Sequence, residues 1–218
     1  MNRPTIIINC AMSLDGKIAS PTGRQVRISS EEDMARVYQL RNKFDAVLVG
    51  INTVINDDPK LTVKERYVSC LNHPIRIVLD PNNKTSETAL IVNDKAKTII
   101  VVDENITISK TYTENVTVLP FPTENGVFNL NQLMMRFSDL GIHSLLVEGG
   151  GTIIWNFISS QLFDDLYVYV GSLIIGGKQT PTMAMGNGFE QEQDFIQLHL
   201  VDSKQLGDGL LLHYQLKK

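Results

Sequence analysis

A carboxylate followed by three glycines is the segment of this sequence that most suggests chemistry: Glu148-Gly149-Gly150-Gly151-Thr152. The apolar residues before Glu148 predict a buried strand, and the residues after the glycines predict a helix. Glycine lets a backbone approach a ligand closely, and the unpaired N–H groups of a first helical turn attract anions such as a pyrophosphate. The same glycines could serve only a tight strand-to-helix turn. Ligands bind at the carboxyl ends of parallel strands, however, and Glu148 lies at such an end.

A second segment, residues 45–59, repeats this arrangement of a buried strand, a glycine and a short helix. Thr53 and Asp57 are four residues apart, so both would project from one face of that helix. Together they could hold a ribose or a nicotinamide amide. The alternative is a helix that ends at Asp58-Pro59 and binds nothing.

A third segment, Met12–Ala19, carries the turn signal Asp15-Gly16 directly after the first predicted strand. It is either an ordinary loop or a loop that lies over a cofactor. Few cations lie near the three segments, and each alone would usually be a solvated surface charge. They are Arg24, Arg27, Arg41 and Lys64. A phosphomonoester substrate would need one or two of them.

Short apolar, β-branched runs predict the strands that would position these segments. They are nearly continuous rather than alternating, as expected for strands that are covered on both faces. The runs are Thr5–Met12, Asp45–Gly50, Ile75–Asp80, Thr98–Asp103, Val116–Phe121 and Ser144–Val147. In the C-terminal third, Leu166–Ile175 is a longer run, and residues 194–203 and 210–217 flank the hairpin signal Gly207-Asp208-Gly209.

Helical periodicity alternates with these runs. The first long helix is predicted to begin at a capping box, in which Ser29 accepts from the Glu32 amide, and to end near Lys43. Two further helices are predicted over residues 131–140, before Gly141, and from Gly150 or Gly151 to about Gln161.

The predicted fold class is therefore α/β, with a mostly parallel central sheet, helices on both faces and a C-terminal antiparallel hairpin. Neither a repeat nor a low-complexity linker interrupts the sequence, so a single domain over residues 1–218 is expected. Residues 81–87 and 180–193 are the best candidates for exposed loops.

Composition narrows the class of protein. Hydrophobic residues make up 43 % of the 218 residues and charged residues 20 %, which is a globular balance. The net charge of −4 is dispersed, which argues against a nucleic-acid partner. Cys10 lies in the first apolar run and is expected to be a buried free thiol. The two cysteines and four scattered histidines suggest no metal site. Without a signal peptide or an apolar run of ~20 residues, the chain is expected to be cytoplasmic and not bound to membranes.

Taken in order, the three segments resemble the reductases of riboflavin biosynthesis that act on 2,5-diamino-6-ribosylamino-4(3H)-pyrimidinone 5′-phosphate. These are free-standing enzymes in archaea and fungi, and they are similar to the carboxyl half of the bacterial deaminase-reductase. The resemblance covers essentially the whole chain. It rests on residues 13–19, Leu40-Arg41, residues 45–50 with Thr53, Asp57-Asp58-Pro59, residues 61–63, residues 74–80, residues 147–150, residues 162–166 and residues 173–177.

The resemblance implies a dihydrofolate-reductase-like fold and a homodimer. It implies hydride transfer from NADPH, with NADH as the alternative cofactor, to C1′ of the ring-opened imine of the phosphorylated ribosylaminopyrimidine. The 6-ribitylamino compound would be the product. The cofactor would contact Thr53, Asp57, Gly149, Gly150, Gly151, Thr152 and Ile153. The substrate would contact Gln25, Arg41, Leu61, Lys64 and Glu148. Glu148 and Asp57 are the candidate catalytic residues, and no metal is implied.

Three positions depart from the bacterial pattern. Gln25-Val26-Arg27-Ile28-Ser29 stands where the bacterial members have Ser-x-Trp-Ile-Thr. Lys64 replaces an Arg, and Pro81 replaces a Ser on the cofactor side. Lys84 is a candidate contact for a cofactor 2′-phosphate. A dihydrofolate or other pteridine reductase, and a nucleotide-binding module without catalysis, are the alternative functions.

Overall fold

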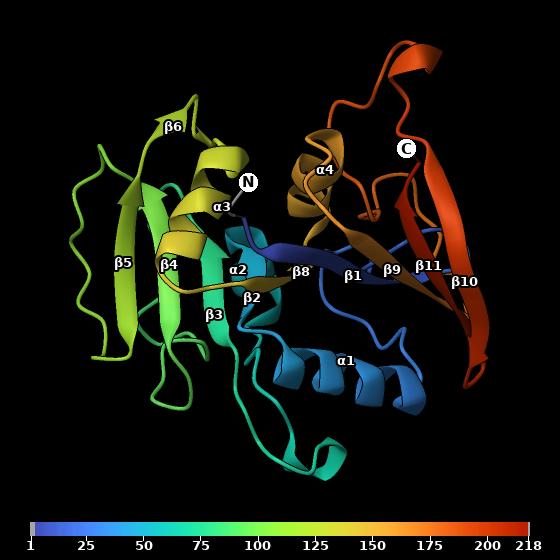
Figure 1. The fold of residues 1–218 in the computed structure, drawn as a ribbon, viewed down its shortest axis with the longest axis horizontal. Helices are drawn as coiled ribbons and strands as arrows, with labels where there is room; N and C mark the ends of the chain where they lie inside the picture. The colour runs from blue at the N-terminus through green and yellow to red at the C-terminus, as the bar shows by residue number, and fades with distance from the viewer. Residues whose placement is uncertain (1–2, 218) are drawn as a thin grey trace. The chain divides into compact units, whose positions relative to one another are not determined.

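The computed structural model describes residues 3–217, and Figure 1 labels their main helices and strands. The chain consists of two compact units. Unit 1 contains the residues up to Thr5 together with residues 38–146, and unit 2 contains residues 6–37 and 147 onward. Helix α1 (Glu31–Lys43) and strand β8 (Ser144–Gly149) contribute residues to both units. None of the helices in the described range is long and apolar enough to cross a membrane.

Unit 1 is built on four parallel strands in the order β2 (Ala46–Gly50), β3 (Ile75–Leu79), β4 (Thr98–Asp103) and β5 (Val116–Phe121). Their carboxyl ends are in register, since Gly50 lies opposite Leu79 and Leu79 opposite Val101. All five residues of β2 are buried, which explains why its sequence is continuously apolar. The strands predicted from the apolar runs are confirmed here.

The helices of unit 1 follow local sequence signals. Helix α2 (Ile51–Asp57) begins directly after β2 and ends at Asp58, which has φ 40° and precedes Pro59. Helix α3 (Leu130–Asp139) is capped by Asn129, whose side chain accepts from the Gln132 N–H. Three short elements were not expected from the sequence: the 3₁₀ turn η1 (Glu65–Tyr67) and the paired strands β6 (Thr123–Glu124) and β7 (Val127–Phe128).

Unit 2 has parallel and antiparallel neighbours. Strand β1 (Thr5–Ser13) pairs in parallel with β9 (Asp165–Gly171); β9 pairs antiparallel with β11 (Gly209–Leu216), and β11 with β10 (Leu198–Leu206). The predicted C-terminal hairpin is confirmed. Helix α4 (Gly151–Ser159) and the 3₁₀ turn η2 (Glu192–Asp194) complete the unit. Cys10 is buried in β1 as a free thiol, as predicted, and burial together with Asp33 raises its pKa to about 12.

Two predicted boundaries were wrong. Strand β9 ends at Gly171, not Ile175, because the chain turns there: Leu173 N–H donates to the Gly171 carbonyl. Strand β10 begins at Leu198, not at residue 194, because η2 occupies residues 192–194.

The N-terminal cap of α1 is displaced by one residue from the prediction. Ser30, not Ser29, is the cap: its hydroxyl accepts from the Asp33 N–H at 3.2 Å and its carbonyl accepts from the Met34 N–H. The hydroxyl of Ser29 instead donates to the Asp33 carboxylate at 2.5 Å. Asp33 therefore determines which of the two adjacent serines caps α1, because its N–H donates to Ser30 and its carboxylate accepts from Ser29.

Candidate active site

Glu148 and the glycines after it form the predicted strand-to-helix junction. Glu148 is half-buried, one residue before the end of β8. Gly149 has φ +110°, a conformation that side-chain-bearing residues rarely adopt. Gly150 caps α4 in an extended conformation and offers no side-chain hydrogen bond to it. The first turn of α4 therefore has no side-chain cap, and helix N-termini of this kind can bind an anion such as a pyrophosphate.

Gly151 is needed for a different reason. A Cβ atom at Gly151 would lie 2.4 Å from the Thr182 carbonyl oxygen and 2.8 Å from Met185 Cγ. The Met185 N–H also donates to the Gly151 carbonyl at 3.0 Å. The glycine therefore makes room for the chain's own loop, and the sequence alone offered no signal for this packing. Thr152 is exposed and Ile153 is half-buried.

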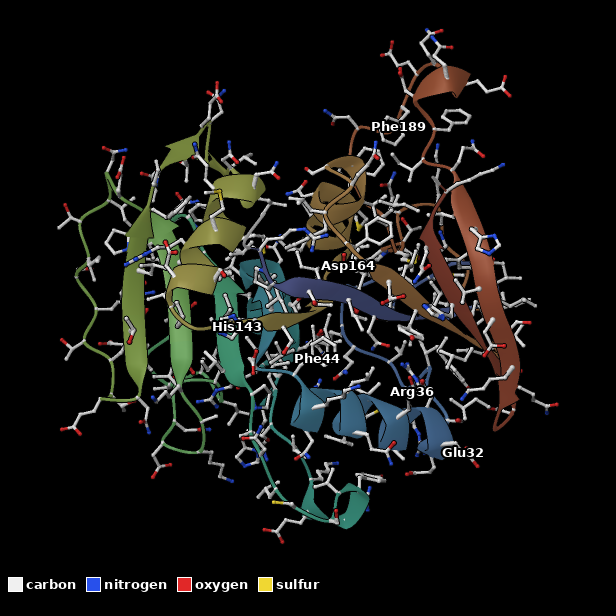
Figure 2. All side chains as sticks on the ribbon, viewed as in Figure 1. Glu32, Arg36, Phe44, His143, Asp164 and Phe189 are labelled. Atoms are coloured by element: carbon white, nitrogen blue, oxygen red, sulfur yellow. The ribbon has the colours of Figure 1, made fainter. Side chains whose placement is uncertain are left out.

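The same loop contacts α4 through aromatic residues. The ring centroid of Phe189, which is labelled in Figure 2, lies 4.9 Å from that of Trp155. A Cβ atom at Gly186 would lie 2.0 Å from the Trp155 ring. The segment predicted as an exposed loop, residues 180–193, is thus anchored on α4 at several points, although most of its residues are exposed.

The Asp15 turn is tied to the segment after β9. Asp15 accepts from the Ser13 hydroxyl at 2.6 Å and from the N–H groups of Ile175 and Gly176 at 3.0 and 2.7 Å. The Ser13 bond and the two N–H groups lower the pKa of Asp15 to about 2. The carboxylate therefore has a structural use within unit 2.

The segment that departs from the bacterial pattern, residues 25–29, precedes α1. It is exposed at Gln25 and Arg27. Gln25 is exposed and precedes α1 in a stretch without regular structure. Arg27 forms an exposed ion pair with Glu31, with 2.7 Å between Nη2 and Oε1. The pair links the segment before α1 to the first residue of the helix and gives Arg27 a partner on the surface.

Helix α2 presents Thr53 and Asp57 one turn apart, as their spacing predicted. Both residues are half-buried. The neighbouring Asp58 has the structural role instead: it is the C-cap of α2, and its Oδ1 accepts from the Leu90 N–H at 2.7 Å. Asp58 therefore ends the helix, and the face that carries Thr53 and Asp57 has no part in ending it.

The predicted phosphate cations meet on one aromatic ring. The Arg41 guanidinium carbon lies 5.5 Å from the centroid of Tyr38, and the Lys64 ammonium lies 5.2 Å from it. Arg41 also donates to the Thr62 carbonyl at 3.4 Å. Leu61, with φ 49° and 3 % exposure, begins the loop that carries Lys64.

Sequence reasoning missed Tyr38 and the tyrosine that stacks on it, Tyr67. Their rings are parallel to within 8° and 5.0 Å apart. The spacing of Tyr38 and Arg41, three residues apart on one helix, was an available signal. The contribution of Tyr67 was not, because it comes from a separate loop.

The loop after β3 is more ordered than the prediction of an exposed segment implied. The buried carboxylate of Asp80 accepts from the N–H groups of Lys84 and Thr85 and from the Thr85 hydroxyl. Lys110 donates to the Asn83 and Thr85 carbonyls. The side chain of Lys84 remains exposed at the surface of this loop.

Unit 1 thus carries one group of the predicted residues and unit 2 carries the other. Unit 1 holds Thr53, Asp57, Arg41, Leu61 and Lys64. Unit 2 holds Gln25, Glu148 and residues 149–153. Within residues 3–217, no group of three or more potential metal-ligating side chains gathers.

Comparison with known proteins gives a consistent result. Residues 4–212 match the family model of the RibD C-terminal domain. The chain is 37 % identical over 215 residues to the 2,5-diamino-6-ribosylamino-4(3H)-pyrimidinone 5′-phosphate reductase of Methanothermobacter thermautotrophicus, covering 99 % of both chains. It is 38 % identical over 196 residues to the protein of the same name from Archaeoglobus fulgidus, covering 86 % of this chain and 89 % of that one.

Solved structures show the fold. A deaminase/reductase from Thermotoga maritima superposes with a TM-score of 0.84 at 22 % identity, and this chain covers 57 % of it. The Saccharomyces cerevisiae riboflavin biosynthesis reductase Rib7 superposes with a TM-score of 0.75 at 20 % identity, with 91 % of that chain covered. The predicted dihydrofolate-reductase-like α/β fold is thereby confirmed.

Proposed function

The chain belongs to the RibD C-terminal domain family, and on that premise we propose that it reduces 2,5-diamino-6-ribosylamino-4(3H)-pyrimidinone 5′-phosphate to the 6-ribitylamino compound with NADPH. The family match spans residues 4–212, which supports treating residues 1–218 as a single reductase domain. Relatives that carry this activity in their names align over 99 % and 86 % of the chain.

The observation that carries the proposal is the pair of cations on Tyr38. A phosphomonoester needs charge-assisted donors, and Arg41 supplies a planar fork while Lys64 supplies a point charge. Both lie within 5.5 Å of the Tyr38 centroid, from different segments of unit 1. Dihydrofolate has no phosphate, so this pair of cations favours the phosphorylated ribosylaminopyrimidine over a pteridine as the substrate.

The cofactor-binding proposal rests on two helices. The first turn of α4, with its glycine cap, suits the pyrophosphate, and the Thr53–Asp57 face of α2 suits polar groups of the ribose or nicotinamide. When bound, the nicotinamide supplies a hydride to C1′ of the ring-opened imine. One proton must reach the imine nitrogen, which completes reduction of the C=N bond to an amine.

Glu148 and Asp57 are the candidates for handling that proton and for orienting polar groups of the substrate. Glu148 is half-buried at the carboxyl end of a strand, and Asp57 is half-buried at the end of α2. Glu148→Gln keeps the shape of the side chain but removes its charge. A kcat that is unchanged in this variant would exclude Glu148 from proton transfer, and the matched Asp57→Asn variant applies the same test to Asp57.

The decisive assay follows loss of reduced-nicotinamide absorbance. Purified protein is given NADPH with the diamino substrate, with its deaminated form, or with dihydrofolate. Oxidation with the diamino compound alone supports the proposal and places reduction before deamination. Oxidation with dihydrofolate would favour a pteridine reductase, and NADPH binding without any turnover would favour a non-catalytic nucleotide-binding module.

Preference for NADPH over NADH is proposed to depend on Lys84. The loop that carries it is folded around the buried carboxylate of Asp80 at the carboxyl end of β3. Parallel strands bind ligands at that end, and the exposed Lys84 ammonium is suited to a 2′-phosphate. Lys84→Gln should raise the KM for NADPH and leave that for NADH unchanged, with Lys95→Gln as the control. Equal effects on both cofactors would exclude this role.

We also propose a homodimer. Strand β10 is the edge strand next to β11, and its exposed apolar residues include Leu198, Leu200 and Val201. An exposed apolar edge is usually covered in solution. Light scattering of the wild type and of Leu200→Lys tests this: a wild-type dimer that the substitution dissociates supports it, and a wild-type monomer would refute it.

A further inference from the structure

The stacked tyrosines of unit 1 have no role in the function proposed so far. Tyr38 is 7 % exposed on α1, and Tyr67 is half-buried in η1. Their rings are 5.0 Å apart and nearly parallel. Three cations lie over this pair: Arg41 and Lys64 over Tyr38, and Arg66 over Tyr67 at 4.6 Å.

We propose that the Tyr38–Tyr67 stack is the positioning element of the phosphate site, holding Arg41 and Lys64 on one ring so that both meet the substrate phosphomonoester. This inference rests on the proposed function, in which those two cations bind the phosphate. It assigns positioning roles to two residues that do not themselves carry charge.

An aromatic ring holds a cation without consuming its donors. The attraction comes from the negative face of the ring, so the N–H groups of Lys64 stay available for an anion. A carboxylate partner would instead accept those N–H groups and cancel the charge. Within residues 3–217 the Lys64 ammonium forms no ion pair, and Tyr38 is the partner that the structure gives it.

Holding the two side chains also reduces the entropic cost of binding. Free Lys and Arg side chains lose rotamer entropy when they are fixed. The ring already restricts both, so less ordering remains to be done when the phosphate arrives. The two cations repel each other over a shared ring, and a dianionic phosphate between them relieves that repulsion.

The loop that carries Lys64 is fastened to α1 at both ends. At its beginning, between the buried residues Leu61 and Val63, the Thr62 carbonyl accepts from Arg41 of α1 at 3.4 Å. At its far end the Asn72 N–H donates to the side chain of Asn42 at 2.7 Å. Between these points, Tyr67 of η1 stacks on Tyr38 of the helix. Loss of either ring should therefore release Lys64 from its place above Tyr38.

The test compares the phosphorylated substrate with the same compound lacking its phosphate. Tyr38→Leu removes the ring, and it should raise KM for the phosphorylated substrate about tenfold, with a much smaller change in kcat. The dephosphorylated compound should react equally well with wild type and variant. Tyr38→Phe restores the ring and should recover most of the lost affinity. Tyr214→Leu, at a half-buried tyrosine of β11, is the matched control.

A second variant guards against misfolding, since Tyr38 is buried. Tyr67→Leu changes a half-buried residue and should raise the same KM, by a smaller factor. A calorimetric titration with ribose 5-phosphate measures binding of the phosphate independently of turnover. A Tyr67→Leu variant that melts normally and binds ribose 5-phosphate as tightly as the wild type would overturn the inference. Equal losses with both substrates would also overturn it, since they indicate a purely structural role.

Arg41→Ala separates this inference from the proposed function. If Arg41→Ala abolishes the preference for the phosphorylated substrate and both tyrosine variants keep it, only the positioning role fails. If Arg41→Ala and Lys64→Ala both leave that preference intact, the phosphate site itself is wrong and the positioning role fails with it.

Discussion

Each unit has a cluster in which cations lie over tyrosine rings, and the two clusters differ in what else the cation touches. In unit 2 the Arg36 guanidinium lies 5.8 Å from the centroid of Tyr167. It also donates to Asp33 at 2.7 Å and to the side-chain oxygen of Asn9 at 2.7 Å. In unit 1 the Lys64 ammonium has the Tyr38 ring and, within the described chain, no carboxylate.

The difference separates a cation used for folding from one kept for a ligand. The N–H groups of Arg36 donate to buried acceptors. The Asp33 side chain is 0 % exposed, and the Arg36 side chain is 16 % exposed. The other group on Tyr167 also has a carboxylate partner, because His213 stacks on that ring at 4.3 Å and lies 2.6 Å from Asp165. A ring contact alone therefore indicates nothing about function; the companion contacts decide it.

The largest effect should come from breaking the unit 2 cluster. Asp33→Ala leaves a largely buried guanidinium without its carboxylate, which should lower the free energy of unfolding by about 3 kcal/mol. Urea denaturation measures this. Asp33→Leu combined with Arg36→Met removes both charges and should recover much of the loss. A cost below about 1 kcal/mol for Asp33→Ala would show that the Arg36 pair is not structural.

Removing a cation from the unit 1 cluster should weaken substrate binding and leave the free energy of unfolding nearly unchanged. Lys64→Ala removes one charge-assisted contact to phosphate, which should raise KM for the phosphorylated substrate roughly 10- to 100-fold. Its free energy of unfolding should change by less than about 0.5 kcal/mol, since the side chain is exposed. Lys64→Arg should retain most of the binding. A large loss of stability in Lys64→Ala would erase the contrast between the two clusters.

A smaller effect is expected at the outer face of Tyr167. His213→Leu keeps an apolar neighbour for the ring but removes the partner of Asp165, whose carboxylate keeps the Gln215 amide at 2.9 Å. The free energy of unfolding should fall by about 1 kcal/mol, without any change in KM for the phosphorylated substrate. Denaturation and steady-state kinetics on the same preparation give both values. A raised KM would mean that unit 2's cluster also serves the substrate.

The sequence predicted most strands because they are buried on both faces, so their apolar runs are continuous. It also predicted the Glu148–glycine junction and the Thr53–Asp57 face, since both depend on local spacing. It failed where distant contacts decide. Ser30 became the cap of α1 because Asp33 is fixed by Arg36, which Asn9 of β1 holds.

The aromatic part of the proposed phosphate site could not be predicted from the sequence, for the same reason. Tyr38 and Arg41 are one helical turn apart and visible as a pair, but Tyr67 reaches Tyr38 only when the loop folds back. The loop after β3 is similar, because its order depends on Lys110 and Tyr112, more than 20 residues away. Local patterns predicted the elements, while the contacts that assign roles to side chains came from the fold.

The smallest expected effect is a pH dependence located beside Lys64. His73 accepts from the Val63 N–H through Nδ1 at 3.2 Å. Burial, and then the positive charges of Arg76 and Lys95, lower the pKa of His73 below its ordinary value of 6.5, and Glu65 opposes the shift. As pH falls below 6.5 the unfolded chain therefore takes up this proton first. The contribution to stability is complete above pH 6.5 and is lost as the pH falls toward the folded-state pKa.

Protonation of His73 also removes the lone pair that holds the Val63 N–H, so acid should loosen the segment that carries Lys64. His73→Gln supplies a neutral acceptor and should make unfolding midpoints less dependent on pH between about 5 and 7, where the ordinary histidine pKa lies. His143→Gln, at an exposed histidine, should leave that dependence unchanged. If His73→Gln and the wild type lose stability in parallel, His73 does not hold this segment, and the order of the unit 1 cluster depends on its tyrosines alone.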